Sequence, residues 1–478
     1  MKKLLISVVT LLFINQIKAQ DIAGSWQGVI TVSSTNLRLV FNIKKTDTSY
    51  TTTFDSPDQK VFGIACSKTY KVKDSVFIEI ALIKGGYKGL WDGKDGITGI
   101  YRQGSGHITV DMKRMNDADK AGLAKDRVRP QTPKPPYNYA SEDVEYDNAD
   151  KSMHYGATFT KPNGGGKYPA VIIISGSGTQ DRDGSMMGHK PYWVLADYLT
   201  KNGIAVLRVD DRGAGKSSLG KDISSATSAD FSYDVEASLN YLETRNDVDK
   251  KHLGLIGHSE GGIIAPMVAA RRKDVNFIVL WGAPVIGGAR IWTEQQGDAI
   301  KEMGVDSTAV NAFKSLNLQI LDQFASSSNT DVLDQEIATI FDDWKKSQSP
   351  KVLSTLWPNG VVTAKDLFKG YNSLYDAVWW HFFIVYDPAK DLGKVTCSVL
   401  AVDGSKDVQV RAKPNLAVIK EILTKSGNKH FEVKELPGLN HLLQTANTGA
   451  ESEYEKIDET MSPEAMKIIS DWIKIHTK

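Results

Sequence analysis

Cysteine is scarce in this sequence, with only Cys66 and Cys397 among 478 residues. We assign these two to different domains, so we expect no disulfide bridge between them. Neither lies near a second Cys or a His, and no segment has the spacing of a zinc site. The segment Gly213-Ala-Gly-Lys-Ser217 lacks the first glycine of a phosphate-binding loop, because that position falls on Asp210. We therefore expect neither a metal nor another cofactor.

An excess of charge of one sign is also missing. The chain has 58 Lys and Arg against 57 Asp and Glu, for a net charge of +1 at pH 7. Proteins that bind nucleic acids or other polyanions usually carry a clear basic excess. The charge balance gives no reason to expect a nucleic-acid partner, and a small-molecule substrate is the better expectation.

The sequence also lacks an apolar run long enough to span a membrane. Its N-terminal run, at residues 4–14, follows Lys2 and Lys3 and precedes Ala19. A basic start, a short apolar core and a small residue before a polar chain are typical of a secretory signal peptide. We therefore predict a signal peptide at residues 1–19, with cleavage near Ala19, and a secreted or periplasmic protein without a membrane span.

Residues 20–115 have the pattern of a small all-β domain. Short alternating runs are separated by Gly, Asp and Ser, which predicts an antiparallel sheet that forms a sandwich or a small barrel. The runs lie at residues 26–32, 37–43, 50–54, 76–82, 97–101 and 108–112. The opening residues 21–28 are similar to the first strand of lipocalin-like modules. Such a domain can bind a ligand, stabilise a homodimer or cover a catalytic domain, and we favour the last two roles.

The remainder of the chain alternates between strand and helix patterns. A Pro-rich connector at residues 116–140 separates it from the β domain. From residue 141 to 478, nearly continuous apolar runs predict strands buried on both faces of a mostly parallel sheet. Between about residues 286 and 391 the pattern becomes helical and rich in aromatic residues. We interpret that segment as a helical cap inserted between two strands of an α/β domain.

One stretch inside this domain, Gly257-His-Ser-Glu-Gly261, has the form Gly-x-Ser-x-Gly between a strand pattern and a helix pattern. In a strand-to-helix elbow of this kind, a strained backbone pushes the serine hydroxyl into the open. The two glycines allow the strand and the helix to cross close to the serine. A surface serine in a Gly-rich turn is the alternative, but the flanking patterns favour Ser259 as a nucleophile.

A serine nucleophile needs a base and an acid. His441 follows the last predicted strand, at the sheet edge where the elbow also emerges, so we predict that it is the general base. The loop after Val402 contains two candidates for the carboxylate that orients this histidine, Asp403 and Asp407. We prefer Asp407, because Asp403 directly follows the strand and more naturally caps the turn. The resulting order is Ser259, Asp407, His441.

An acyl-transfer reaction also needs hydrogen-bond donors for the oxyanion. The backbone N–H of Glu260, directly after the nucleophile, is one expected donor. The second should come from the loop Ser175-Gly-Ser-Gly178 after the third strand. We predict the N–H of Ser177, with Gly178 as the alternative.

These motifs together resemble the α/β-hydrolase superfamily, and more narrowly bacterial secreted esterases with a helical cap. The resemblance covers residues from about 140 to 478 and rests on the loop at 175–183, the segment 206–217, the elbow at 257–262 and Gly438-Leu-Asn-His441. It implies hydrolysis of carboxylic esters, often with short acyl chains. The His-Gly-Gly-Gly loop of lipase-type relatives is absent, which argues against long-chain lipase activity.

The sequence therefore predicts a serine carboxylesterase that acts on short-chain esters through an acyl-enzyme. Two alternatives remain open. One is a serine peptidase of the prolyl-oligopeptidase type, although about ninety-five residues of β-structure are too few for the propeller that such enzymes usually carry. The other is a non-catalytic binding protein on a hydrolase scaffold.

Overall fold

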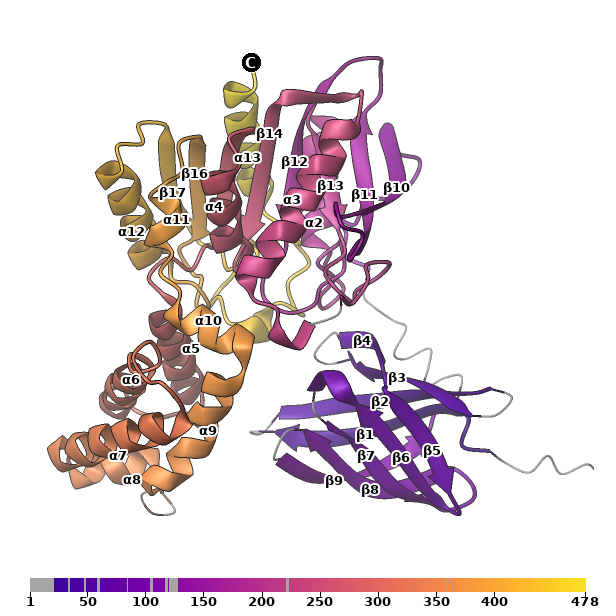
Figure 1. The fold of residues 1–478 in the computed structure, drawn as a ribbon, viewed down its shortest axis with the longest axis vertical. Helices are drawn as coiled ribbons and strands as arrows, with labels where there is room; N and C mark the ends of the chain where they lie inside the picture. Colours follow the sequence, from indigo (N-terminus) through magenta and orange to yellow (C-terminus); the bar gives the residue numbers. More distant parts are fainter. Residues whose placement is uncertain are drawn as a thin grey trace, which may run out of the picture. The chain divides into compact units, whose positions relative to one another are not determined.

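The computed structural model consists of two compact units, Met1–Asp126 and Arg127–Lys478 (Figure 1). The signal peptide predicted at residues 1–19 lies outside the described residues. The structure describes residues 21–478 except 33–34, 47–48, 58–60, 84, 104–105, 117–118, 120–127, 221–222, 359 and 361.

In the described part of the N-terminal unit, nine strands form one antiparallel sheet. The strands follow the order β4-β3-β2-β1-β9-β8-β7-β6-β5 across the sheet. The sheet curls on itself, since the Thr69 hydroxyl of β5 donates a hydrogen bond to that of Thr52 in β3 over 2.8 Å. The strands are β1 (Gly24–Val32), β2 (Thr35–Lys45), β3 (Tyr50–Ser56), β4 (Val61–Ala65), β5 (Lys68–Val72), β6 (Ser75–Ile80), β7 (Gly85–Trp91), β8 (Gly96–Gln103) and β9 (Gly106–Arg114). It is therefore one curled sheet, not the two facing sheets of a sandwich.

Aromatic side chains fill the concave face of this sheet. Trp26, Phe41 and Tyr87 are almost fully buried there. The Tyr87 hydroxyl of β7 lies within donating distance of the carbonyl oxygens of Ile97 on β8 and Val110 on β9. Because side chains occupy the interior, the domain has a packed core of its own.

The second unit is built on an eight-stranded sheet with the order β10-β11-β13-β12-β14-β15-β16-β17. The β10–β11 and β11–β13 pairs are antiparallel, whereas all later neighbours are parallel. The strands are β10 (Tyr139–Asp147), β11 (His154–Pro162), β12 (Tyr168–Ile174), β13 (Ala205–Val209), β14 (Val248–His258), β15 (Val275–Trp281), β16 (Ser398–Gly404) and β17 (Phe431–Leu436). If these strands are numbered from one to eight along the chain, their order across the sheet is 1-2-4-3-5-6-7-8. The parallel strands β12, β14, β15, β16 and β17 therefore have their carboxyl ends at one edge of the sheet.

Helices cover both faces of this sheet, as the doubly buried strand patterns require. One face packs against α3 (Ser228–Thr244), α4 (Gly261–Arg271) and α12 (Ala412–Lys425). The other packs against α2 (Pro191–Lys201) and α13 (Pro463–His476). The central strands are therefore shielded from water on both sides (Figure 1).

In the described part of the chain, seven helices are inserted between β15 and β16, and the first six lie beyond one end of the sheet, whereas the short last one, α11 (Ala389–Leu392), packs beside the sheet against α4 and α12 (Figure 1). The first six pack around an aromatic core of their own, which includes Phe324, Phe341 and Trp344. These six are α5 (Gly288–Glu302), α6 (Ser307–Leu321), α7 (Thr330–Ser347), α8 (Pro350–Leu356), α9 (Ala364–Asp376) and α10 (Val378–Val385). No helix in the described part of the chain combines the length and apolar character needed to cross a membrane.

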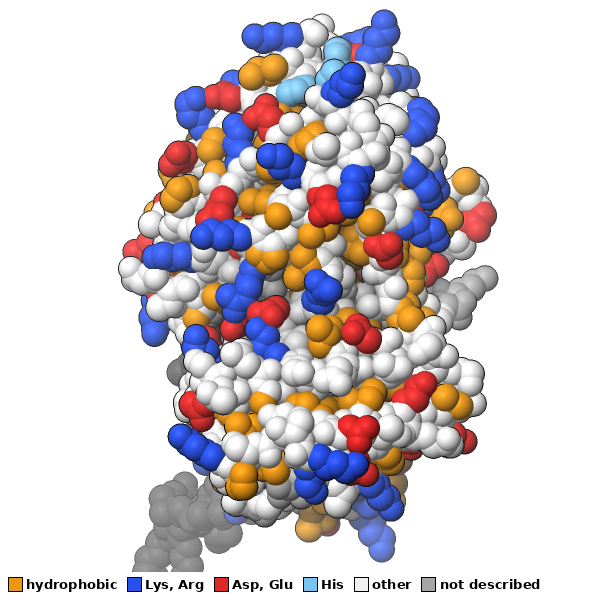
Figure 2. Space-filling model, turned by 90° about the vertical axis from the view of Figure 1, so that its left-hand side faces the viewer, with side chains coloured by type: hydrophobic (Ala, Val, Ile, Leu, Met, Phe, Trp, Pro, Cys, Tyr) orange, Lys and Arg blue, Asp and Glu red, His pale blue; other side chains and the backbone are white. Residues whose placement is uncertain are grey.

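Part of the segment expected to connect the domains packs against the second unit. Arg129 is fully buried and donates hydrogen bonds to the carbonyl oxygens of Met187, Glu455 and Ile457. Residues 129–138, directly before β10, therefore belong to the second unit. On the visible face of the molecule, basic and acidic side chains are interspersed, in keeping with the near-zero net charge (Figure 2).

Candidate active site

Ser259 occupies the sharp turn between the end of β14 and the start of α4. Its φ angle is 53°, in the left-handed region that non-glycine residues rarely adopt. The turn is held in place because the Ser259 N–H donates to the carbonyl oxygen of Trp281 on β15, over 2.8 Å. Strain at one residue, stabilised by its neighbours, is the property expected of a nucleophile elbow.

Gly257 allows the helix to approach the strand at this turn. A Cβ atom placed at Gly257 would lie 2.0 Å from the carbonyl oxygen of Gly261 and 2.8 Å from the nitrogen of Gly262. Both are backbone atoms, so the clash can be relieved only if α4 moves away from β14.

Gly257→Ala is accordingly expected to lower the free energy of unfolding by about 1–3 kcal/mol, the usual cost of overpacking, and to displace Ser259. Thermal denaturation together with an ester-hydrolysis assay measures both effects. Gly165→Ala is the matched control, because a Cβ atom there meets nothing within 4 Å. Equal stability of the two variants would contradict the close approach of strand and helix.

His441 and Asp407 form a buried hydrogen-bonded pair. The distance from His441 Nδ1 to Asp407 Oδ2 is 2.5 Å, and both residues are less than 5% exposed. The other carboxylate oxygen of Asp407 accepts the backbone N–H groups of Gln409 and Val410, each over 2.8 Å. Asp407 is thus oriented on both sides, and Nε2 is the histidine nitrogen left to exchange a proton.

The structure brings Ser259 and His441 to the wall of the same cavity, which has a volume of about 710 Å³. His258 also contributes to this wall, but its Nδ1 forms a 2.9 Å hydrogen bond with the Tyr192 hydroxyl. Burial and the neighbouring His441 hold the pKa of His258 well below its usual value, so that ring stays neutral. Its ring centroid is 4.7 Å from that of His441.

Asp403, the alternative acid, lies on β16 and does not bond to His441. Burial and the nearby Asp407 carboxylate hold the pKa of Asp403 well above its usual value. Of the two carboxyl groups, only Asp407 forms a hydrogen bond with His441.

The loop expected to supply the second oxyanion donor follows β12 and borders the cavity. Tyr192 on α2 holds this loop, because its hydroxyl accepts the Gly176 N–H over 3.2 Å and donates to Gln180 over 3.1 Å. The N–H groups of Ser177, Gly178 and Glu260 form no hydrogen bond with another described residue. These three donors are therefore free to bind a ligand oxygen, and the choice between Ser177 and Gly178 stays a prediction.

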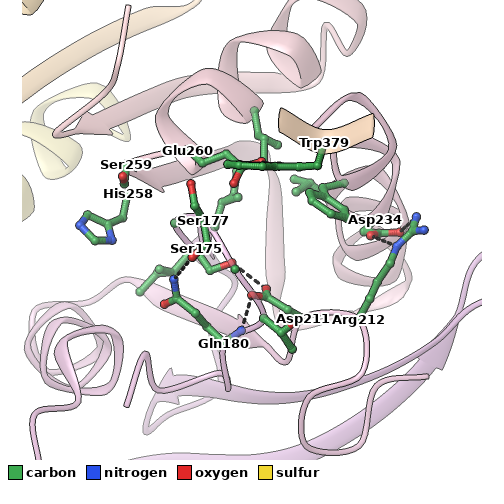
Figure 3. A pocket seen from close by; sticks show the side chains of 18 of the residues that line it. Ser175, Ser177, Gln180, Asp211, Arg212, Asp234, His258, Ser259, Glu260 and Trp379 are labelled. Atoms are coloured by element: carbon green, nitrogen blue, oxygen red, sulfur yellow. Dashed lines mark hydrogen bonds and ion pairs between the residues drawn. The ribbon is translucent and has the colours of Figure 1, made fainter. Parts of the chain in front are cut away.

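The Glu260 side chain is a feature that the sequence interpretation missed. Its carboxyl group is buried next to the nucleophile and accepts hydrogen bonds from the Ser228 hydroxyl (2.6 Å) and the Trp379 indole N–H (2.8 Å). The Ser177 hydroxyl is a further hydrogen-bond donor to Glu260, and burial raises the pKa of the Glu260 carboxyl group. One carboxyl group therefore connects the elbow, the loop after β12, α3 and the inserted helix α10 (Figure 3).

Asp211 is a second carboxyl group on the cavity wall, and it is partly buried. It accepts the Ser175 hydroxyl over 2.6 Å and the Gln180 N–H over 2.8 Å (Figure 3). Burial raises the pKa of Asp211 to about 8. The Asp-Asp-Arg segment at residues 210–212, which the sequence interpretation used only for the family resemblance, was the available signal for this site.

The raised pKa of Asp211 implies a pH dependence of stability with a defined sign. Between pH 4 and 8 the folded protein retains this proton and the unfolded chain releases it, so the free energy of unfolding falls as pH rises. The contribution is at most about 1.4 kcal/mol per pH unit. Asp211→Asn, which cannot titrate, is expected to flatten the decline; urea denaturation at several pH values measures it. Parallel curves for the two proteins would show that Asp211 is ionised in the folded state.

The family model described as "Serine aminopeptidase, S33" matches residues 187–337, a range that includes the elbow. Esterase EstD of Thermotoga maritima is 25% identical over 285 residues, which are 59% of this chain and 57% of that protein. The uncharacterized protein YfhR of Escherichia coli O157:H7 is 26% identical over 147 residues, or 30% of this chain and 48% of that protein. This chain thus spans only about half the length of either curated relative.

Among solved structures, similar chains include the esterase Pf2001 of Pyrococcus furiosus, with a TM-score of 0.41 and 13% identity over 73% of this chain and 98% of that one. DcsB in complex with a substrate analogue has a TM-score of 0.42 and 15% identity over 70% of this chain and 99% of that one. Within the described residues, no group of three or more His, Cys, Asp or Glu side chains is arranged to hold a metal ion.

Proposed function

We propose that this chain, an α/β-hydrolase with an additional N-terminal β domain, is a serine carboxylesterase that acts through an acyl-enzyme. The observation that carries the proposal is that Ser259, on its strained elbow, and His441, which is paired with Asp407, line the same cavity. A nucleophile, an oriented base and free N–H donors at one cavity wall are the parts that acyl transfer requires. The similarity to Esterase EstD supports the same reaction class.

In the proposed mechanism, His441 Nε2 takes the proton of the Ser259 hydroxyl as the oxygen attacks the ester carbonyl carbon. Asp407 keeps the remaining ring proton on Nδ1 and stabilises the imidazolium. The N–H groups of Glu260 and Ser177 bind the negative oxygen of the tetrahedral intermediate. His441 then returns its proton to the departing alcohol, and a water molecule activated by the same histidine releases the acid.

The inserted helices act as the cap in this proposal. Helix α10 supplies Trp379, Trp380 and Phe383 to the cavity wall, so this segment limits which groups reach Ser259. The substrates proposed from the sequence resemblance are carboxylic esters with short acyl chains.

A serine peptidase is the second candidate, because the matching family model bears the description of an aminopeptidase. The decisive experiment compares p-nitrophenyl esters of increasing acyl length with aminoacyl p-nitroanilides. An esterase should turn over the acetyl or butyryl ester and leave the anilides nearly untouched. Activity restricted to anilides would favour the peptidase. A fluorophosphonate probe that failed to label the protein would favour the non-catalytic scaffold.

We also propose that residues 1–19 are removed during export, as the N-terminal sequence pattern indicates. Mass spectrometry of the protein from the periplasm or the medium of an expressing bacterium would give the mature N-terminus.

For the β domain we propose a role in stabilising a homodimer or in covering the hydrolase domain. Light scattering of the intact chain tests the dimer.

A further inference from the structure

The cavity contains a second polar group of residues, opposite the nucleophile. Arg212 and Asp234 line it together with Tyr155, and they lie on the other side of the site from Ser259 (Figure 3). Arg212 donates from Nε and Nη2 to the two oxygens of Asp234 over 2.7 and 2.9 Å. The Tyr155 hydroxyl donates to Asp234 over 2.5 Å. We call Tyr155, Arg212, Phe231 and Asp234 the distal group.

The space between Ser259 and the distal group has aromatic walls. Trp379, Trp380 and Phe383 come from α10, and the rings of Trp379 and Phe383 stack with centroids 5.3 Å apart. Phe231 comes from α3, and the guanidinium carbon of Arg212 lies 5.6 Å from its ring centroid. Such walls favour a flat apolar group over a flexible alkyl chain.

The size of the cavity exceeds what a small ester needs. Cavities of about 300–1,000 Å³ enclose drug-sized ligands, and this one is about 710 Å³. An acetyl ester reacting at Ser259 would leave the distal group without a contact. The distal group is therefore available to bind a larger part of the substrate.

The charge of the distal group defines the chemistry of that part. Arg212 and Asp234 balance each other, so the pair offers no net charge to an ionic ligand. Arg212 Nη1, however, forms no hydrogen bond with any described residue and can donate to an oxygen acceptor. An uncharged ring that carries an oxygen satisfies both the aromatic walls and this donor.

We propose that the distal group makes the enzyme selective for esters that carry an uncharged aromatic group with a hydroxyl or ether oxygen. The ring lies in the space lined by Phe231 and the α10 aromatics, and its oxygen accepts a hydrogen bond from Arg212. This proposal rests on the proposed esterase function. The proposal concerns the larger part of the ester, which can be either the acyl part or the alcohol part.

Two matched pairs of esters test it. In one pair the ring is in the alcohol, 2-phenylethyl acetate and its 4-hydroxyphenyl analogue. In the other it is in the acid, methyl 3-phenylpropanoate and its 4-hydroxyphenyl analogue. A hydrogen bond from a charged donor predicts roughly a tenfold higher kcat/KM for the hydroxylated ester in one pair. The ratio is taken within one enzyme preparation, so it does not depend on the fraction of folded protein.

The variant Arg212→Met with Asp234→Asn removes both charges together, which avoids a buried unpaired charge. It should reduce the ratio to about one. The control variant is Arg271→Met with Glu236→Gln, a second Arg–carboxylate pair, which joins the end of α4 to α3 and does not line the cavity. It should retain the wild-type ratio. No preference in either pair, or a preference that survives in the Arg212–Asp234 variant, would overturn the proposal.

Binding to the Ser259→Ala protein separates this proposal from the proposed reaction. Quenching of tryptophan fluorescence by the hydroxylated ester should give a Kd roughly tenfold lower than that of the unsubstituted ester. Equal Kd values would refute the distal group as a binding site even if p-nitrophenyl acetate is hydrolysed. Conversely, a failure to hydrolyse any ester, with this binding preference intact, would refute only the esterase function.

Discussion

Ser259→Ala is expected to reduce kcat for a p-nitrophenyl acyl ester by roughly 10⁴- to 10⁶-fold, the range seen when a triad nucleophile is removed. The reason is chemical, because alanine cannot form the acyl-enzyme. The protein should remain folded, because the substitution removes only one oxygen atom. Alanine keeps the Cβ atom, so the backbone strain at φ 53° does not increase. Steady-state kinetics and circular dichroism of the purified variant measure the two properties.

A matched serine separates this effect from a general loss of hydroxyl groups. Ser470 in α13 is buried, and its hydroxyl has no hydrogen-bond partner among the described residues. Ser470→Ala should therefore keep the wild-type rate. If Ser259→Ala kept that rate too, the elbow would not be the reactive centre and the proposed function would be wrong.

Asp407→Asn is expected to lower kcat by about 10⁴-fold, as amide replacement of a triad acid does elsewhere. The backbone N–H groups of Gln409 and Val410 will hold the amide oxygen where Oδ1 now lies. The amide nitrogen must then face His441 Nδ1 and donate to it. That forces the histidine proton onto Nε2, the nitrogen that has to accept a proton from Ser259.

Asp197→Asn provides the control for this substitution. Asp197 is on α2, where it bonds to Tyr139 and Lys201 and does not line the cavity. Its amide variant should match the wild-type rate. A rate for Asp407→Asn within tenfold of wild type would mean that another group orients His441, and Asp403 would then be the residue to replace.

The proposed reactive residues could be predicted from the sequence because each follows a strand pattern. In a parallel sheet the carboxyl ends of neighbouring strands meet at one edge, so Ser259, Asp407 and His441 were expected to lie close together. The choice of Asp407 over Asp403 also used only local position. The structure adds the partner of each atom, including the two N–H groups that orient the Asp407 carboxylate.

Three strands of the β domain, β4, β5 and β7, were not predicted from the sequence. β7 is the clearest case, because glycines interrupt its alternating pattern. A Cβ atom at Gly86 would lie 2.2 Å from the carbonyl oxygen of Ile78, so the neighbouring strand β6 requires glycine there. The requirement comes from a strand pairing, which a local pattern does not contain.

The side-chain contacts of the carboxyl groups in the cavity were not predicted from the sequence, for a related reason. Glu260 looked like a residue whose backbone alone mattered, since its side-chain partners Ser228 and Trp379 lie 32 and 119 residues away. Asp234 on α3 and Arg212 after β13 looked like parts of two separate elements. Only the packing of α3 against the sheet brings them into one cavity.

The sequence by itself predicted the proposed class of chemistry and the positions along the chain of the strands of a mostly parallel sheet. Both depend on short-range patterns, namely the periodicity of buried strands and the glycines of a strained turn. The tertiary structure alone decided which carboxyl groups lose their solvent, how far the cavity extends beyond Ser259, and which aromatic side chains form its walls. Those properties arise where α3, α10 and the loop after β12 meet, and contacts between segments so far apart in the chain leave no local signal.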